Sequence, residues 1–242
     1  MKYFDNIQRI LGYVRKACEK YSMIDEGDRI GVGVSGGKDS LTLLCALSQL
    51  RSFYPKKFEI EAITVSMGFE NDNFDEIKKL CKEIGCDYTI VNTDIYEIVF
   101  GIRKEKNPCS LCSKLRRGAL QNICIESDCT KLALGHTLDD IGETVLMNLF
   151  YEGRYGCFSP VTKLDGINLS IIRPLIYTKE KEIISFCKKE NIPVMKSNCP
   201  ADKNTQRSKI KDIIDNMDKE HRGINHRILS SLEQTQTDGF KS

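Results

Sequence analysis

Short apolar segments alternate with amphipathic helical segments along this chain, and the first apolar segment runs directly into a glycine-rich loop. Residues 29–34 are rich in Ile, Val and Gly and predict a strand that ends at this loop, with a helix over residues 41–50 behind it. Short, continuous apolar strands separated by helices are typical of a parallel sheet that is covered on both faces. The pattern therefore predicts an α/β fold, in which a parallel twisted sheet carries helices on both faces.

The same strand-and-helix unit recurs further along the chain. Further strands are predicted over residues 60–65, 88–91 and 132–134 and from residue 171, and further helices over residues 75–84, 139–151 and 179–189. We expect three parts: an N-terminal helix that packs on the core (1–28), the sheet domain (29–200) and a basic helical tail (201–242). Ligands of such sheets bind beyond the carboxyl ends of the strands, which makes the loops after the first and fourth strands the candidate site.

The loop after the first strand has the sequence Ser35-Gly36-Gly37-Lys38-Asp39-Ser40. It overlaps a match to the dinucleotide pattern G-x-G-x-x-G, but the next strand does not end in the acidic residue that would bind a ribose. A Walker A loop is also excluded, because Asp39 stands where that loop has Ser or Thr. Two hydroxyls, backbone N–H groups freed by glycine, a helix N-terminus and the Lys38 ammonium together suit a pyrophosphate. We therefore predict an ATP-binding loop.

The loop after the fourth strand has the sequence Gly135-His136-Thr137-Leu138-Asp139-Asp140. Gly135 is expected to line the nucleotide site, and His136 is a candidate to orient a phosphate or move a proton, although a backbone partner in a turn explains such a histidine nearly as well. Asp139 and Asp140 are candidate catalytic carboxylates. Asp is also favoured as the cap of a following helix, so that structural role remains open for both.

The chain contains eleven cysteines, and Cys109 and Cys112 form a C-x-x-C pair at the start of a predicted helix. A helix N-terminus and the basic residues that follow are expected to lower the pKa of these thiols, which makes them candidate thiolates and metal ligands. The sequence has no second C-x-x-C, which argues against a four-cysteine zinc site. A redox-active pair and an incidental pair remain open alternatives.

Five stretches carry a resemblance that runs over nearly the whole chain: residues 21–29, 35–40, 108–120, 172–175 and 198–207. Together they resemble the tRNA 2-thiocytidine synthetase family of PP-loop ATP pyrophosphatases, which are iron–sulfur-dependent tRNA thiolases with an adenine nucleotide alpha-hydrolase-like fold. The resemblance implies that Cys109, Cys112 and Cys199 hold a [4Fe-4S] cluster with one iron left open for chemistry.

The resemblance also implies a reaction. The enzyme would use ATP and Mg²⁺ to adenylate the C2 carbonyl oxygen of a tRNA pyrimidine, with cytidine 32 as the expected target, and sulfur delivered via the cluster would replace that oxygen. Lys38 and the loop amides would hold the pyrophosphate, and Asp39, with Asp139 and Asp140, is a candidate Mg²⁺ ligand. A sulfur donor such as a cysteine desulfurase and a homodimeric assembly are further implied.

Two stretches depart from the family pattern. Thr137 stands where the cytidine enzymes usually have a second histidine, and residues 151–156 differ from their Gly- and Met-rich version. Residues 135–148 are locally closer to the tRNA 2-thiouridine enzymes, whose paired C-x-x-C modules this sequence lacks. The rival predictions are a 2-thiouridine synthase, a lysidine synthetase-like enzyme without a functional cluster, a cluster-free thiolase that uses a cysteine persulfide, and a non-catalytic sensor.

The net charge is only +2, so binding to tRNA must be argued from local clusters of basic residues. The candidate contacts are Arg116, Arg117 and Arg207, and the neighbouring basic residues include Lys104, Lys106 and Lys203. The N-terminus has no signal-peptide core, and no apolar run approaches the length of a membrane span. We therefore expect a cytoplasmic protein that has no membrane partner.

Overall fold

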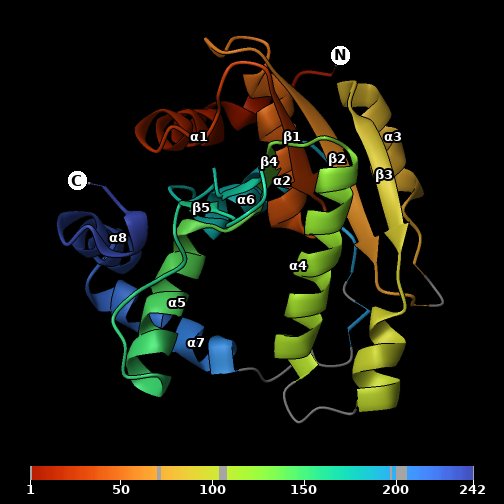
Figure 1. Ribbon diagram of the computed structural model, residues 1–242. Helices are drawn as coiled ribbons and strands as arrows, with labels where there is room; N and C mark the ends of the chain where they lie inside the picture. Colours follow the sequence, from red (N-terminus) through yellow and green to blue (C-terminus); the bar gives the residue numbers. More distant parts are fainter. Residues whose placement is uncertain (1, 70–71, 104–107, 197, 200–205, 242) are drawn as a thin grey trace.

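Six strands form one sheet in this protein, and the helices are arranged around it (Figure 1). The computed structural model describes residues 2–69, 72–103, 108–196, 198–199 and 206–241. The strands are β1 (Asp28–Gly33), β2 (Phe58–Ser66), β3 (Asp87–Asn92), β4 (Lys131–Ala133), β5 (Val161–Lys163) and β6 (Ser170–Ile172).

The order of the strands across the sheet is β3-β2-β1-β4-β6-β5. The strand β1 pairs in parallel with β2 on one side and with β4 on the other. The outer pairs β2–β3 and β4–β6 are also parallel, whereas β5 is antiparallel to β6. The chain builds one half of the sheet outward from β1 and then returns to build the other half, so the strand order reverses between β1 and β4. Such a switch point leaves a crevice at the carboxyl ends of the two central strands.

The described helices are η1 (Asp5–Ile7), α1 (Gln8–Lys20), α2 (Lys38–Leu50), α3 (Asp75–Ile84), the π-helix η2 (Glu97–Arg103), α4 (Pro108–Glu126), α5 (Leu138–Tyr151), α6 (Glu180–Lys189), α7 (Gln206–Glu220), α8 (Ile224–Gln234) and η3 (Thr237–Gly239). Helices α1, α2, α3 and α6 contribute to the larger hydrophobic core. Helix α4 contributes Cys124 to a second, smaller core with Ile63 of β2 and Leu132 of β4. Helix α5 packs against α7 and α8 beside the sheet (Figure 1).

The predicted fold class is confirmed, and the predicted strands and helices match observed ones with ends that differ by a few residues. The sequence did not predict β5 or η2. The strand β5 (Val161–Lys163) lies antiparallel at the edge of the sheet with no buried residue, so it lacks the apolar run that marked the equally short β4 and β6. The division at residues 28 and 200 stays a prediction, although Val14 of α1 and Leu232 of α8 are both fully buried in the larger core.

In the described part of the chain, no helix combines the length and the apolar character that crossing a bilayer requires. Lys104, Lys106 and Lys203, which the sequence analysis proposed for tRNA contact, lie outside the described residues.

Candidate active site at the switch point

The two loops predicted to form the site lie side by side, because β1 and β4 are neighbouring parallel strands. Gly135, which follows β4, lies directly against the backbone at the start of α2. A Cβ atom at this position would lie 3.1 Å from both the carbonyl carbon of Asp39 and the amide nitrogen of Ser40. Any side chain here would push the two loops apart, so glycine is what allows them to form one site.

The Ser35–Ser40 loop is held in shape by its own serines. Ser40 Oγ accepts a hydrogen bond from Ser35 N at 3.1 Å and donates one to Gly37 O at 2.9 Å. Gly36 has a φ of +79°, and its carbonyl oxygen accepts a hydrogen bond from Met195 N at 2.9 Å. A Cβ atom on Gly36 would lie 2.6 Å from Met195 Sδ. Both the left-handed backbone and the contact with Met195 therefore require glycine at this position.

The start of α2 faces a cavity of about 270 Å³. Gly37 precedes this helix without a side-chain cap, so the first N–H groups of α2 are available to a ligand. The polar lining of the cavity includes Ser35, Asp39, Ser40, His136 and Asp140, and the apolar lining includes Ile63, Val65, Leu120 and Leu134. Helix N-termini bind phosphate groups through these amides and the helix dipole, and the apolar wall suits a purine ring.

Lys38 lies between two carboxylates. Its Nζ atom is 2.9 Å from Asp39 Oδ2 and 3.0 Å from Glu180 Oε1. Burial lowers the pKa of Lys38, but the hydrogen bonds and charges of Asp39 and Glu180 outweigh burial, and the net shift is upward. The ammonium is therefore charged, and it lines a second cavity of about 260 Å³ beside the first. The ammonium has three N–H donors and the two carboxylates occupy two of them, so one donor is left for a phosphate oxygen.

Asp39 lines both of these cavities. Its Oδ2 atom pairs with Lys38, whereas its Oδ1 atom is buried and has no hydrogen-bond partner among the described residues. Burial raises the pKa of Asp39, and Lys38 opposes that shift. A buried carboxylate oxygen without a partner is unfavourable, and a Mg²⁺ ion that also contacts phosphate oxygens would satisfy it. Asp39 therefore fits the predicted contact with Mg²⁺.

Asp139 and Asp140 both have structural partners. Asp140 Oδ2 accepts hydrogen bonds from the backbone nitrogen and Oγ1 of Thr137, each at 2.8 Å, and Thr137 is the N-cap residue of α5. Asp139 Oδ2 accepts a hydrogen bond from Glu180 N at 2.6 Å, and its Oδ1 accepts one from Asn225 Nδ2 at 3.1 Å. The N-cap position that the sequence left open for the two aspartates is therefore taken by Thr137, with Asp140 as its capping-box partner, while Asp139 joins α5 to α6 and α8. A catalytic role for either residue stays a prediction.

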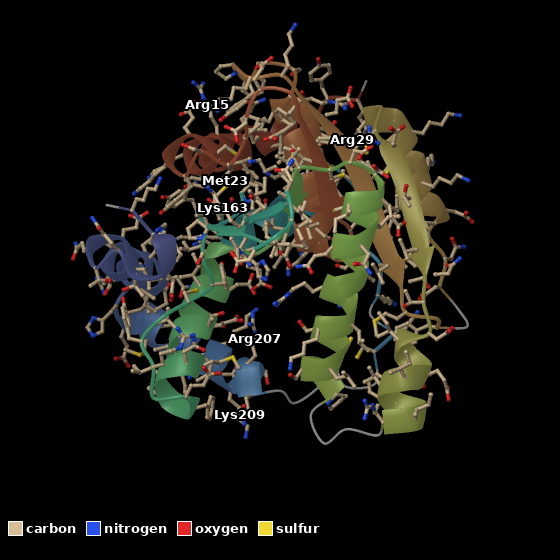
Figure 2. All side chains as sticks on the ribbon, viewed as in Figure 1. Arg15, Met23, Arg29, Lys163, Arg207 and Lys209 are labelled. Atoms are coloured by element: carbon tan, nitrogen blue, oxygen red, sulfur yellow. The ribbon has the colours of Figure 1, made fainter. Side chains whose placement is uncertain are left out.

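Arg207 extends from the first turn of α7 to α5 (Figure 2). Its Nη1 atom lies 2.8 Å from Asp140 Oδ1 and 3.2 Å from Glu143 Oε2. Burial raises the pKa of Glu143 to about 7, and the charge of Arg207 opposes that shift. Arg207 lines the same cavity as Lys38, so the structure directs this guanidinium toward the active site. Its predicted contact with tRNA stays a prediction.

His136 lines the nucleotide cavity and packs against Phe158, with 4.7 Å between the ring centroids. Its Nδ1 atom is buried without a partner among the described residues. Burial lowers the pKa of His136 to about 4, and the positive charge of Arg173 acts in the same direction. The ring is therefore neutral near pH 7. It can exchange a hydrogen bond with a nucleotide but does not add a positive charge for a phosphate group.

This lowered pKa predicts that acid destabilises the protein through His136. Between pH 6.5 and pH 4 the unfolded chain binds a proton at this residue and the folded protein does not, so stability is lost as the pH falls. Between pH 7.5 and pH 5.0, we expect wild-type protein to lose about 2 kcal/mol more stability than the variant His136→Gln. Urea unfolding at the two pH values measures the difference. Equal losses in both proteins would show that His136 does not titrate abnormally.

Two of the cysteines predicted to bind a cluster, Cys112 and Cys199, lie beside the Ser35–Ser40 loop. A third cavity, of about 270 Å³, is lined by Ser35 and Gly37 of the loop and also by Cys112 and Cys199. Cys109 lies one helical turn before Cys112 on α4 and is exposed. The structure thus brings Cys199 from a distant part of the sequence to the cavity of Cys112. We call this cavity the thiol cavity.

The expected lowering of the thiol pKa is wrong for Cys112. Burial raises the pKa of this thiol, the charge of Arg116 lowers it without compensating, and Cys199 and Cys109 raise it further. The sequence showed the cations of α4 but not the packing, which places Cys112 Sγ 3.9 Å from Met67 Sδ. A bound metal would deprotonate such a thiol outright.

Two thiols in the cavity lining and a third one helical turn away on α4 have the donor chemistry that an iron–sulfur cluster requires. Within the ranges that the structure describes, no three His, Cys, Asp or Glu side chains are close enough together to hold a metal ion. Cluster binding would therefore have to draw Cys109, Cys112 and Cys199 together.

The switch point between β1 and β4 and the loop at the start of α2 together define a PP-loop ATP-binding domain. The family model for the PP-loop domain matches residues 8–217. The NH3-dependent NAD synthetase of Campylobacter jejuni shares the fold, with a TM-score of 0.50 and 13% identity over 99% of this chain and 96% of that one.

Three further comparisons narrow this class. The tRNA-cytidine(32) 2-sulfurtransferase of Geobacter sulfurreducens is 37% identical over 244 residues, which cover 98% of this chain and 94% of the relative. The enzyme of the same name from Nitrosospira multiformis is 37% identical and covers 97% and 78%. The structure of the U34-tRNA thiolase NcsA from Methanococcus maripaludis, with its [4Fe-4S] cluster, has a TM-score of 0.77 at 30% identity and covers 95% and 78%. The chain belongs to the tRNA-cytidine(32) 2-sulfurtransferase family of PP-loop proteins.

Sequence reasoning missed several residues of the site. Glu180 pairs with Lys38 only because α6 begins beside the loop, and Met195 contacts Gly36 from a segment without regular structure. Neither residue belongs to a recognisable motif. Glu143 lies in a Gly-Glu-Thr run just after the aspartate pair, and that position was the available signal for it.

Proposed function

We propose that this protein is an ATP-dependent tRNA sulfurtransferase, which adenylates the C2 carbonyl oxygen of cytidine 32 and replaces that oxygen with sulfur. One observation carries the proposal: Ser35 and Gly37 line both the nucleotide cavity and the thiol cavity. Activation of the base and delivery of sulfur can therefore take place on the two sides of a single loop. Membership of the family supports tRNA as the substrate and cytidine as the base.

In the activation step, Lys38 and the first amides of α2 hold the pyrophosphate of ATP, and the adenine ring lies against the apolar wall of the nucleotide cavity. The C2 carbonyl oxygen of the base attacks the α-phosphorus, the bond to pyrophosphate breaks, and the base becomes an O-adenylate. The protein accelerates this step by positioning the reactants and stabilising charge. Arg116 lines both cavities, so it is placed to contact the phosphate that joins the two substrates.

Two groups complete the proposed site. Asp39 would hold Mg²⁺ through its unpartnered Oδ1 atom, and the ion would neutralise charge on the phosphates. Cys109, Cys112 and Cys199 would hold a [4Fe-4S] cluster, which supplies an open iron position for sulfide. Replacement of the activated oxygen by sulfur breaks the C2–O bond and releases AMP, which the nucleotide cavity holds.

The proposed partners are tRNA and a sulfur donor such as a cysteine desulfurase, and we propose a homodimer that acts in the cytoplasm. Arg117 is exposed on α4, and Arg116 lies next to it at the cavities. Both therefore remain our proposed tRNA contacts on this helix.

Mass spectrometry of tRNA nucleosides tests the proposed function. A strain that lacks this gene is compared with the same strain carrying the gene on a plasmid. We expect 2-thiocytidine to disappear in the deletion strain and to return with the plasmid. Loss of a 2-thiouridine instead would identify uridine as the target, and unchanged thionucleosides would overturn the proposal. A protein that thiolates tRNA without iron after anaerobic purification would contradict the cluster.

A further inference from the structure

Three aromatic rings form a continuous row beside the thiol cavity. The ring centroids of Phe69 and Tyr96 are 4.9 Å apart, and those of Tyr96 and Phe100 are 5.3 Å apart. Phe69 follows β2, and the other two residues lie in the segment that includes the π-helix η2, between β3 and α4. The side chain of Tyr96 is 36% exposed. We call Phe69, Tyr96 and Phe100 the aromatic row.

The row begins in the active site. Phe69 lines the thiol cavity together with Cys112 and Cys199. Figure 1 shows η2, in yellow-green below β3, beside the end of α4 at which the C-x-x-C pair lies. The rings therefore lead outward from the place where a base would meet the thiols.

Backbone contacts hold this row in place. Tyr96 N donates a hydrogen bond to Met67 O at 2.9 Å, which joins the segment of η2 to the loop after β2. Thr93 Oγ1 donates to Ser66 O at 2.7 Å and joins the same two segments. π-Helical turns are rare and are found frequently at functional sites. These two hydrogen bonds fix the segment that carries Tyr96 and Phe100 to the end of β2.

The charge in the lining of the thiol cavity, where the row begins, favours a polyanion. Among the described residues that line the thiol cavity, Arg116 and Lys196 are cationic and Asp72 is the carboxylate. Asp72 accepts a hydrogen bond from Ser66 Oγ at 3.0 Å, and this donor partly neutralises the negative charge of the carboxylate. Arg116 and Lys196 therefore outnumber the carboxylate in the described cavity lining, so a phosphate backbone is expected to run past them while its bases face the rings.

We propose that the aromatic row is a stacking platform for unpaired RNA bases, with the target pyrimidine entering the thiol cavity past Phe69 and the adjacent base stacking on Tyr96. Enzymes that modify a base take it out of its stack, and exposed RNA bases commonly stack on aromatic side chains. This inference rests on the proposed function, because it takes tRNA as the substrate. Tyr96 is a positioning residue in this scheme and does not touch the reacting atoms.

The test compares Tyr96→Leu, which removes the aromatic face and keeps apolar volume, with Tyr96→Phe, which keeps the face. Fluorescence anisotropy with a tRNA transcript that carries cytidine 32 measures binding. We expect Tyr96→Leu to raise the Kd roughly 5- to 150-fold, the range typical of one base–aromatic stack, and to raise KM for tRNA more than it lowers kcat. Tyr96→Phe should stay within about twofold of wild type, and ATP binding should not change in either variant.

Tyr3→Leu is the matched control, because Tyr3 is a 62% exposed tyrosine in the N-terminal segment and belongs to no part of the site. Phe100→Leu provides an independent variant in case Tyr96→Leu does not fold. Wild-type affinity of both folded leucine variants would overturn the platform. Failure of the wild-type enzyme to thiolate any tRNA would overturn the proposed function instead, so the two failures are distinguishable.

Discussion

Replacing Lys38 with alanine is expected to reduce pyrophosphate release at least about 100-fold, the loss typical of removing one charged group that stabilises a reacting phosphate. Lys38 is the cation of the Ser35–Ser40 loop, and its charge is maintained by Asp39 at 2.9 Å and Glu180 at 3.0 Å. Iron content after anaerobic reconstitution should be unchanged, because Lys38 does not line the thiol cavity. Single-turnover release of pyrophosphate from labelled ATP, with tRNA present, measures the effect.

Lys131→Ala is the matched control for this experiment. Lys131 is also largely buried, with 14% of its side chain exposed. It begins β4, at the end of the strands opposite to the site, and its Nζ atom lies 3.0 Å from Asp25 Oδ2. It should therefore lose a similar ion pair and retain activity. Lys38→Arg separates charge from geometry, because it keeps the charge and changes the shape of the donor. Normal pyrophosphate release by Lys38→Ala would refute the role of the loop.

Replacing Cys199 with alanine is expected to abolish cluster binding and to reduce thiolation of tRNA by more than about 100-fold. Loss of a residue that merely supports a metal ligand already costs about 10- to 100-fold, and loss of a ligand should cost more. Cys199 lines the thiol cavity but not the nucleotide cavity, so binding of ATP should persist. Iron analysis, visible absorbance and the thiolation rate are measured on the same anaerobic preparation.

Cys86→Ala controls for the removal of a thiol. Cys86 is a partly buried free cysteine that precedes β3, at the opposite end of the strands from the thiol cavity. Its loss should leave both iron content and thiolation near wild type. If Cys199→Ala retained the cluster, Cys199 would not be a ligand. If it lost the cluster and still thiolated tRNA, sulfur delivery would need another route, such as a cysteine persulfide.

The fold was readable from the sequence because its central strands are buried on both sides. The segments that became β1, β2 and β4 are short and apolar, and each precedes a helix or a turn signal, so local pattern alone predicted a parallel sheet. The edge strand β5 escaped prediction because none of its residues is buried and Thr162 and Lys163 break any apolar run. The π-helix η2 also escaped, because its apolar residues are consecutive from Ile98 to Phe100 and Gly101 interrupts them, so no helical spacing is visible.

The pKa values of Cys112 and His136 could not be predicted from neighbouring residues in the sequence. The basic residues near Cys112 were visible in the sequence, but the burial that raises its pKa was not. His136 was recognised as a candidate for contact with phosphate, whereas burial and Arg173 leave it neutral near pH 7. Desolvation depends on what packs over a group, and that packing comes from segments far away in the chain.

By itself, the sequence determined the chemistry that is available to this protein: a pyrophosphate-binding loop, a C-x-x-C pair and a late cysteine. The loop and the C-x-x-C pair consist of residue types at fixed local spacing, and Cys199 was assigned through the family resemblance, so none of the three required knowledge of the fold. Only the tertiary structure decided that Cys199 shares a cavity with Cys112, that Glu180 pairs with Lys38, and that Phe69 of the cavity lining contacts Tyr96. These contacts join segments that are distant in the chain, and the strand order that brings such segments together is set by packing of the whole sheet.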